Sequence, residues 1–139
     1  MDNNSVFTEK LRSSGLRPTK QRIKICKLLF DRKKTFHFTI NDLSKILRDK
    51  TNKKISLATI YNTVHSFKKK GYLKEVAIAS DKSYFDTNIS AHVHFYNEKN
   101  NELTDIDIND IELKKIPTPP KGKSIKDIDI VINIENDSH

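Results

Sequence analysis

Two histidines, His92 and His94, occupy alternate positions of the segment ISAHVHF, residues 89–95. Successive side chains of a strand point to opposite faces, so a strand here would place both imidazoles on the same face, side by side. Imidazole nitrogens are the commonest metal ligands in proteins, and they also bind haem iron. Two interpretations stay open at this point: a pair of metal or haem ligands, and two ordinary imidazoles on a solvated strand.

The single cysteine, Cys26, restricts the chemistry of any such site. One thiol cannot form an intramolecular disulfide, and it cannot supply the cysteine pair of a zinc knuckle. Lys27 follows it, so the Cys-Pro dipeptide that would suggest a thiolate haem ligand is absent. The apolar neighbours Ile25, Leu28 and Leu29 instead predict a small buried side chain.

The charge is divided unevenly along the chain. The net charge is +8, yet residues 1–86 hold 20 Lys and Arg against 8 Asp and Glu, whereas residues 87–139 hold 6 against 10. This division predicts a polyanion-binding domain over 1–86 and a domain with another task over 87–139. Glycine-rich phosphate loops and dinucleotide fingerprints are absent. Neither a membrane-spanning apolar run nor a signal peptide is present, which favours a cytoplasmic protein without membrane contact.

Helical spacing of apolar residues dominates the basic half. Thr19 and Thr39 are expected to cap two helices, the second with Asp42 three residues on as a weak capping box. Ser56 is expected to cap the clearest helix, SLATIYNTVHSFKKKG, which Gly71 ends. Two strand candidates follow, YLKEVAI (72–78) and KSYF (82–85), joined by a turn-rich tetrad. Helices followed by a β-hairpin indicate a winged helix-turn-helix.

The helix after Ser56 has two different faces. Apolar positions, with Leu57 the first, mark one face, and no acid occurs anywhere between residues 55 and 70. A surface held against phosphates requires that absence, because carboxylates would be repelled. Asn62 can read adenine, Thr59 can touch a thymine methyl, and Tyr61 can bond to phosphate. The plainer alternative is a solvated helix face.

Period-2 alternation marks the acidic half. Three segments, AHVHFYN (91–97), ELTDIDI (102–108) and KDIDIVINI (126–134), are typical of half-buried strands. The connector PTPPKG (117–122) excludes a helix, and any helix must be short and lie within 108–116. The roughly fifty residues of this half bury too little surface to be stable alone, which favours a homodimer. The expected fold class is α+β, a winged helix-turn-helix followed by a small β-rich dimerisation domain.

Four segments in this order, GLRPTKQR, SLATIYNT, YFDTNISAHVHF and PTPPKG, resemble the ferric uptake regulator (Fur) family, and most of all its iron response regulator (Irr) branch. The resemblance runs from about residue 9 to 134. It implies a dimeric, cytoplasmic bacterial transcription regulator. It also implies a winged helix for residues 1–86, an α/β dimerisation and metal-sensing domain for 87–139, and a regulatory metal site at the hinge.

Carried onto this sequence, the resemblance places metal ligands at His37, Asp86, His94 and Asp105, with His92 as an adjacent candidate. One divalent transition metal per subunit is implied. Imidazole and carboxylate without thiolate suit Fe(II), Mn(II), Zn(II) or Co(II) and do not choose among them.

Three departures from the family pattern matter. Val93 stands in the middle of the three consecutive histidines typical of the Irr branch, which bears on haem binding. No CxxC pair occurs, so the structural zinc that four cysteines hold in many members is not expected. Asn62 stands where many members have arginine, so a different DNA sequence is expected to be read.

The expected function is therefore an iron-responsive, metal-dependent and haem-modulated regulator, a repressor rather than an enzyme. It would bind AT-rich palindromic double-stranded DNA as a homodimer. The alternatives are a basic RNA- or ribosome-binding adaptor without metal sensing, and a metallohydrolase, for which the sequence offers no general base. The expected DNA contacts are Arg17, Lys20, Arg22, Ser56, Thr59, Tyr61 and Asn62.

Overall fold

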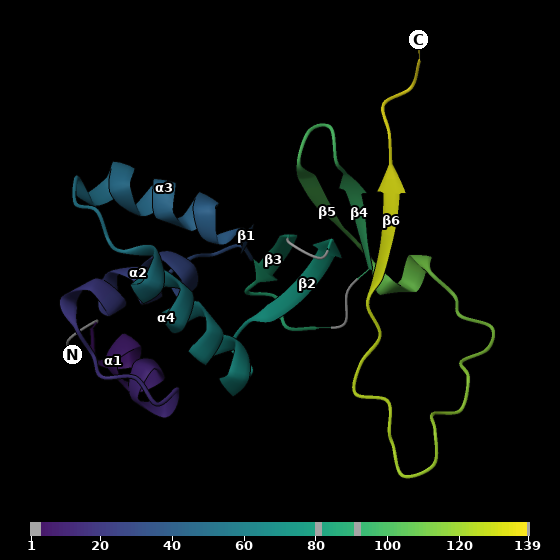
Figure 1. Ribbon diagram of the computed structural model, residues 1–139, viewed down its shortest axis with the longest axis horizontal. Helices are drawn as coiled ribbons and strands as arrows, with labels where there is room; N and C mark the ends of the chain where they lie inside the picture. Colours follow the sequence, from purple (N-terminus) through teal and green to yellow (C-terminus); the bar gives the residue numbers. More distant parts are fainter. Residues whose placement is uncertain (1–3, 80–81, 91–92, 139) are drawn as a thin grey trace. The chain divides into compact units, whose positions relative to one another are not determined.

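The computed structural model describes residues 4–79, 82–90 and 93–138, and the chain divides into two units, Met1–Ile89 and Ser90–His139 (Figure 1). The first unit contains four helices and a small sheet, and the second contains a sheet and a long connector. The domain boundary expected after residue 86 falls at the end of a strand of the first unit.

Four helices form the body of the first unit: α1 (Asn4–Ser13), α2 (Lys20–Phe30), α3 (Ile40–Thr51) and α4 (Leu57–Lys70). Thr19, Thr39 and Ser56 cap α2, α3 and α4 as predicted, each accepting a backbone N–H in the first turn. Gly71 ends α4 with φ 94°, a left-handed conformation that a Cβ would disfavour. Helix α1 was not predicted as a separate element.

The core of this unit is a cluster of aliphatic and aromatic side chains between the helices and the sheet. Ile60, Val64 and Phe67 of α4 are fully buried in it. Leu57 was expected on the same buried face, but it is 51% exposed. As the first residue of α4 its side chain leans past the end of the helix, because Cα–Cβ bonds tilt toward the helix N-terminus. Thr63 is buried as well, and its hydroxyl donates to the Thr59 carbonyl at 2.7 Å.

An antiparallel sheet completes the first unit. Its strands are β1 (His37–Phe38), β2 (Lys74–Ala79) and β3 (Lys82–Asp86), in the order β1-β3-β2. The β2–β3 hairpin is the predicted wing. Strand β1 was missed because two residues are too few to show alternation. Hydrogen bonds from Thr87 N to the Phe36 carbonyl (3.0 Å) and from Phe36 N to Thr87 Oγ1 (2.9 Å) continue the β1–β3 pairing.

The second unit holds a three-stranded sheet in the order β5-β4-β6, formed by β4 (Val93–Asn97), β5 (Glu102–Ile106) and β6 (Ile130–Ile134). Strands β4 and β5 pair antiparallel, whereas β4 and β6 pair parallel. Strand β6 is shorter than predicted, because its ladder with β4 begins at Ile130, so Ile128 lies outside the strand and is exposed. The α+β fold class is confirmed.

The connector from β5 to β6 covers residues 107–129 and contains one short 3-10 helix, Ile108–Asp110. That helix lies inside the predicted window, and the proline-rich segment 117–122 is not helical, as expected. Among the described helices, none combines the length and apolar character needed to cross a membrane.

The capping box of α3 gives a test of the fold. Thr39 Oγ1 accepts from Asp42 N at 3.0 Å, and Thr39 N donates to Asp42 Oδ2 at 3.1 Å. We expect Thr39→Ala to lower the free energy of unfolding by about 1 kcal/mol, the usual effect of losing an N-cap. Urea unfolding followed by circular dichroism measures it. Thr35→Ala, in the exposed loop before β1, is the control, and an equal loss in both variants would contradict the assignment.

Candidate functional site

Helix α4 presents the residues that were predicted to read bases. Tyr61 is 51% exposed, and Asn62 beside it is also exposed. Ser56 and Thr59 lie at the start of the helix with their hydroxyl oxygens 2.9 Å apart, and Ser56 Oγ also accepts the Thr59 N–H. Tyr61 and Asn62 are therefore the side chains most available to a ligand on this face.

The three basic candidates lie at the start of α2 or, for Arg17, just before it. Arg17 and Lys20 are exposed, and Arg22 is half-buried, with its Nη1 donating to the Arg17 carbonyl at 2.9 Å. Backbone N–H groups and the positive end of the helix dipole favour anions at such a position, and the cations add to that field. The arrangement suits backbone phosphates rather than base edges.

A first His–Asp pair lies in the sheet of the first unit. His37 on β1 is directly opposite Asp86 on β3. Opposite residues of an antiparallel pair share one face, with Cβ atoms about 4.5–5.5 Å apart. Asp86 is fully buried, and its Oδ1 accepts the Asn88 N–H at 2.9 Å. Lys74 of β2 flanks Asp86 on its other side in the register.

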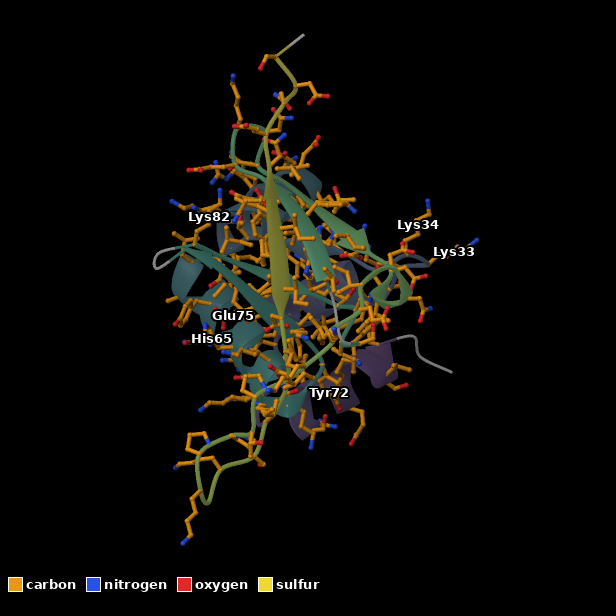
Figure 2. The ribbon with its side chains drawn as sticks, turned by 90° about the vertical axis from the view of Figure 1, so that its right-hand side faces the viewer. Lys33, Lys34, His65, Tyr72, Glu75 and Lys82 are labelled. Carbon is orange, nitrogen blue, oxygen red and sulfur yellow. The ribbon has the colours of Figure 1, made fainter. Side chains whose placement is uncertain are left out.

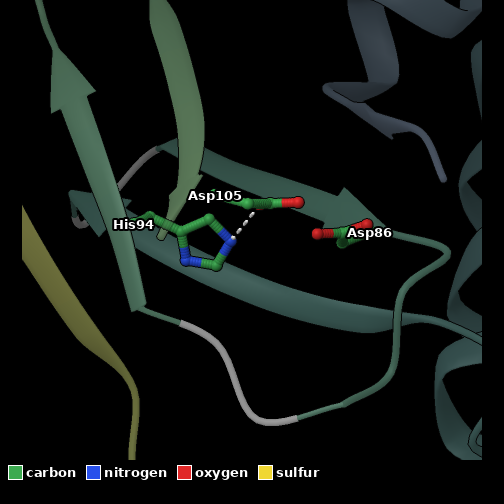
Figure 3. A group of neighbouring side chains, drawn as sticks. All are labelled: Asp86, His94 and Asp105. Carbon is green, nitrogen blue, oxygen red and sulfur yellow. Dashed lines mark ion pairs between the residues drawn. The ribbon is translucent and has the colours of Figure 1, made fainter. Parts of the chain in front are cut away.

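A second His–Asp pair lies in the sheet of the second unit. His94 on β4 is directly opposite Asp105 on β5, with His94 Nε2 3.1 Å from Asp105 Oδ1 (Figure 3, dashed line). The His94 side chain is 1% exposed and that of Asp105 is 37% exposed. The pair therefore offers one buried imidazole and one carboxylate that solvent or an ion can reach.

Four of the five predicted metal ligands thus fall into two cross-strand pairs, one in each unit. Each pair places a histidine opposite an aspartate in the strand register, and Asp86, His94 and Asp105 are of the residue types that hold metal ions. This donor set, nitrogen and oxygen without sulfur, fits Fe(II), Mn(II), Zn(II) or Co(II). The fifth predicted ligand, His92, lies outside the described residues.

The single thiol takes no part in this chemistry. Cys26 is fully buried in the core of the first unit, where its Sγ donates to the Phe7 carbonyl at 3.9 Å. Burial raises the pKa of Cys26 to about 12, although the positive charge of Lys10 partly opposes the shift. At neutral pH the thiolate that would bind a metal or attack an oxidant is scarcely populated. The sequence-based expectation of a small buried side chain is confirmed.

Comparison with known proteins agrees with these features. The sequence profile of the "Ferric uptake regulator family" matches residues 13–133. The chain belongs to the ferric uptake regulator family. Members of this family are regulators, so the expectation that the chain is not an enzyme is confirmed.

This Fur-family chain has curated relatives whose names give peroxide as the signal, whereas we expected iron. It is 36% identical over 95 residues to the "Peroxide-responsive repressor PerR" of Staphylococcus epidermidis, an alignment covering 68% of this chain and 61% of that protein. It is 33% identical over 97 residues to the "Peroxide operon regulator" of Bacillus subtilis, covering 70% and 65%. The matches thus span less than two thirds of these relatives. The family is confirmed, but these relatives are peroxide regulators and do not show the Irr branch.

Solved structures show the same fold. The ferric uptake regulator of Pseudomonas aeruginosa with manganese is 22% identical, covers 94% of this chain and 98% of its own, and gives a TM-score of 0.67. At that identity the likeness supports the fold alone.

Two features of the Fur-family site were not found from the sequence. The pairing of His37 with Asp86 requires β1, which is too short to predict. The contact between Tyr61 and His65, with ring centroids 4.1 Å apart, was also missed, although the spacing of four residues along a helix is the signal that would have found it.

The raised pKa of Cys26 predicts an unreactive thiol. We expect a disulfide reagent such as DTNB to leave the native protein unmodified for hours at pH 8 and to label one thiol promptly in denaturant. Rapid stoichiometric labelling of the native protein would contradict the burial of Cys26. Cys26→Ala serves as the blank.

Proposed function

We propose that this chain is a metal-dependent repressor of transcription that binds double-stranded DNA as a homodimer. One observation carries the proposal. A winged-helix unit with an acid-free exposed helix face also carries a His–Asp pair at the end of its last strand, next to the boundary with a second His–Asp unit. Binding of a metal ion at the His–Asp pairs would then alter how α4 contacts DNA.

The DNA contacts follow from the chemistry of the exposed residues. Asn62 would read a base edge in the major groove, and Tyr61 would contact phosphate or a neighbouring base. Ser56 and Thr59 would contact phosphate at the start of α4, where their hydroxyls already face each other. Arg17, Lys20 and Arg22 would hold the backbone and make binding depend steeply on salt.

The metal site would combine both pairs. His37, Asp86, His94 and Asp105 would supply two imidazoles and two carboxylates to one ion per subunit, with His92 as an adjacent candidate. Seven residues separate Asp86 from His94, enough chain to let the pairs meet, since each residue spans at most about 3.3–3.6 Å. An ion held in this way favours one relative orientation of the units, and DNA selects among such orientations.

A simpler role exists for each pair. Asp86 has Lys74 as its register neighbour, and His94 with Asp105 can act as an ion pair without any metal. A structural ion pair would not bind ions from solution. Metal binding to the purified protein therefore separates the two roles directly.

The signal that we propose first is iron status, read in the cytoplasm through Fe(II) or Mn(II) at this site. Haem is a second form of that signal, although Val93 interrupts the histidine run that the Irr branch typically has. Zn(II) fits the donors equally well and would act as a competitor.

A homodimer is supported by the apolar side chains that the second unit leaves in solvent. Large aliphatic residues recur along the connector and are about half exposed. Such side chains would be buried against a second copy of the chain, and a twofold axis would match a palindromic operator. These residues are Ile108, Leu113, Ile116 and Ile125.

The main test is fluorescence anisotropy on an AT-rich palindromic duplex at fixed salt, with metal-stripped protein, with Mn(II) and with haem. The proposal expects affinity to rise with Mn(II) and fall with haem. Tight DNA binding that changes with neither Mn(II) nor haem would exclude metal sensing and leave DNA binding as the supported function. Weak binding without sequence preference would favour the RNA- or ribosome-binding adaptor.

Peroxide is a second candidate signal, because the relatives named above are peroxide regulators. The buried Cys26 could not carry such a response, so it would have to act at the metal ligands. The test is release of DNA after hydrogen peroxide is added to Fe(II)-loaded and, separately, Mn(II)-loaded protein. Release from the iron form alone would support the peroxide signal, and no release from either form would reject it.

Removing one carboxylate tests the metal site. We expect Asp105→Asn to weaken Mn(II) binding by at least the roughly 10–100-fold that losing an outer-shell partner costs. His94→Ala should abolish both metal binding and metal-dependent modulation of DNA affinity. Isothermal titration calorimetry gives the metal affinity, and the absorption of bound Co(II) reports its coordination.

Glu102→Gln is the matched control, because it removes the same charge from an exposed position of the same strand. Equal affinities for Glu102→Gln and Asp105→Asn would exclude Asp105 as a ligand.

Base reading has its own test. We expect Asn62→Ala to lose about 1–3 kcal/mol of discrimination at one base pair while affinity for unrelated DNA changes little. Lys69→Ala, exposed two turns along the same helix, should weaken all sequences alike and lower the salt slope by about 1. Binding of a duplex library measures both. A uniform loss for Asn62→Ala would restrict Asn62 to phosphate contact.

A further inference from the structure

Five aromatic side chains run in sequence through the first unit, from the His37–Asp86 pair to the exposed face of α4. They come from β1 and the residue before it, from β3 and from α4. The chain is Phe36, Phe38, Phe85, His65 and Tyr61.

The second and third members of the run form the rung, or cross-strand pair, next to the His–Asp pair. Phe38 is opposite Phe85 on adjacent strands, one residue from His37 and Asp86. Because side chains alternate along a strand, the two rungs lie on opposite faces of the sheet, and the phenylalanines are buried in the core. Their ring centroids lie 5.9 Å apart with an interplanar angle of 27°. Any adjustment of β1 against β3 therefore moves both rungs together.

His65 connects this rung to the reading helix. Its ring meets Phe85 edge-on, with centroids 5.7 Å apart at 75°, and lies 4.1 Å from the Tyr61 ring at 37°. Tyr61 is 51% exposed, and among the ring contacts that the structure records for it, His65 is the one that orients it. The direction of the Tyr61 ring thus depends on where His65 sits.

The wing also interacts with His65 from its other strand. Glu75 of β2 lies near His65 (Figure 2) and accepts a hydrogen bond from Lys68 Nζ at 2.5 Å. Burial alone would raise the pKa of Glu75. Hydrogen bonds from Lys68 and Ser83, together with the charges of Lys68 and His65, outweigh burial and hold that pKa below its ordinary value. His65 thus contacts Phe85 of β3 and lies within electrostatic range of Glu75 of β2.

We propose that His65 is a positioning residue, which transmits a change at the His37–Asp86 pair through Phe38 and Phe85 to Tyr61 on the DNA-reading face. The inference rests on the proposed function, since it takes Tyr61 as a DNA contact and the pair as metal ligands. A close-packed interior passes small shifts on as rearrangements of packing, because it has no free volume to absorb them. The route lies wholly within the first unit.

A different role for His65 would be direct attraction of DNA phosphate by a protonated imidazole. Two substitutions separate the roles. His65→Phe keeps a planar ring and loses the charge, whereas His65→Lys keeps a charge and loses the ring. Lys69→Ala is the control, because it removes a cation from an exposed position one turn further along α4.

The experiment measures the DNA affinity of the full chain with and without Mn(II), at fixed salt and pH, and the ratio is the coupling factor. For the unsubstituted protein we expect a factor within the usual range of about 5–150-fold. His65→Phe should keep that factor. His65→Lys and His65→Ala should reduce the coupling factor to within twofold of 1. The Mn(II) affinity of the DNA-free protein should stay unchanged in both variants. Lys69→Ala should weaken binding in both states and keep the factor.

A second readout needs neither metal nor DNA. Proton NMR of the metal-free protein should show nuclear Overhauser effects between the rings of Tyr61 and His65 and between those of His65 and Phe85. Absence of these effects would overturn the proposal, as would an unaltered coupling factor in His65→Ala. If His65→Lys keeps the coupling factor and His65→Phe loses it, His65 instead acts by attracting DNA phosphate through its charge. If Mn(II) leaves the DNA affinity of the unsubstituted protein unchanged, the proposed function itself fails.

Discussion

The register of β1 on β3 is the constraint on which the rest of the first unit depends. A two-residue strand is held there by the ladder and by the hydrogen bonds between Phe36 and Thr87. Because strand side chains alternate, a shift of β1 by one residue would turn its side chains to the opposite faces of the sheet. His37 would then face the core, and Phe38 would face away from it. The position of the proposed ligands and the packing of the core are thus set by one choice of register.

Much of this architecture was predictable because it depends on local chemistry. Ser56 and Gly71 delimit α4 through capping and a left-handed turn, both of which are encoded within a few residues. The same holds for the wing and for the proline-rich connector. Strand β1 could not be found in this way, since its identity comes from a partner almost fifty positions later in the chain. Strand β6 was predicted too long for the opposite reason. The alternation of apolar and polar residues continues upstream of Ile130, but the pairing with β4 begins only at Ile130.

The proposed site was predictable only in part. The resemblance to the family located histidines and aspartates, and the structure groups four of them into cross-strand pairs with one imidazole each. Donor type narrows the choice of ion without fixing it, because nitrogen and oxygen ligands serve several divalent metals. No residue pattern in this chain distinguishes iron status from peroxide as the signal. The peroxide regulators among the relatives show that the iron-sensing expectation was finer than the sequence could support.

The parallel pairing of β6 with β4 has a consequence for how the chain folds during synthesis. Val93 is opposite Ile130, so the sheet of the second unit closes only after the whole connector has left the ribosome. Closing so long a loop carries an entropic cost before any ladder forms, and contacts of high sequence separation form slowly. The first unit contains its own helices and wing and needs none of those later residues. A nascent chain therefore presents a finished, cationic winged-helix unit while its second sheet is still open.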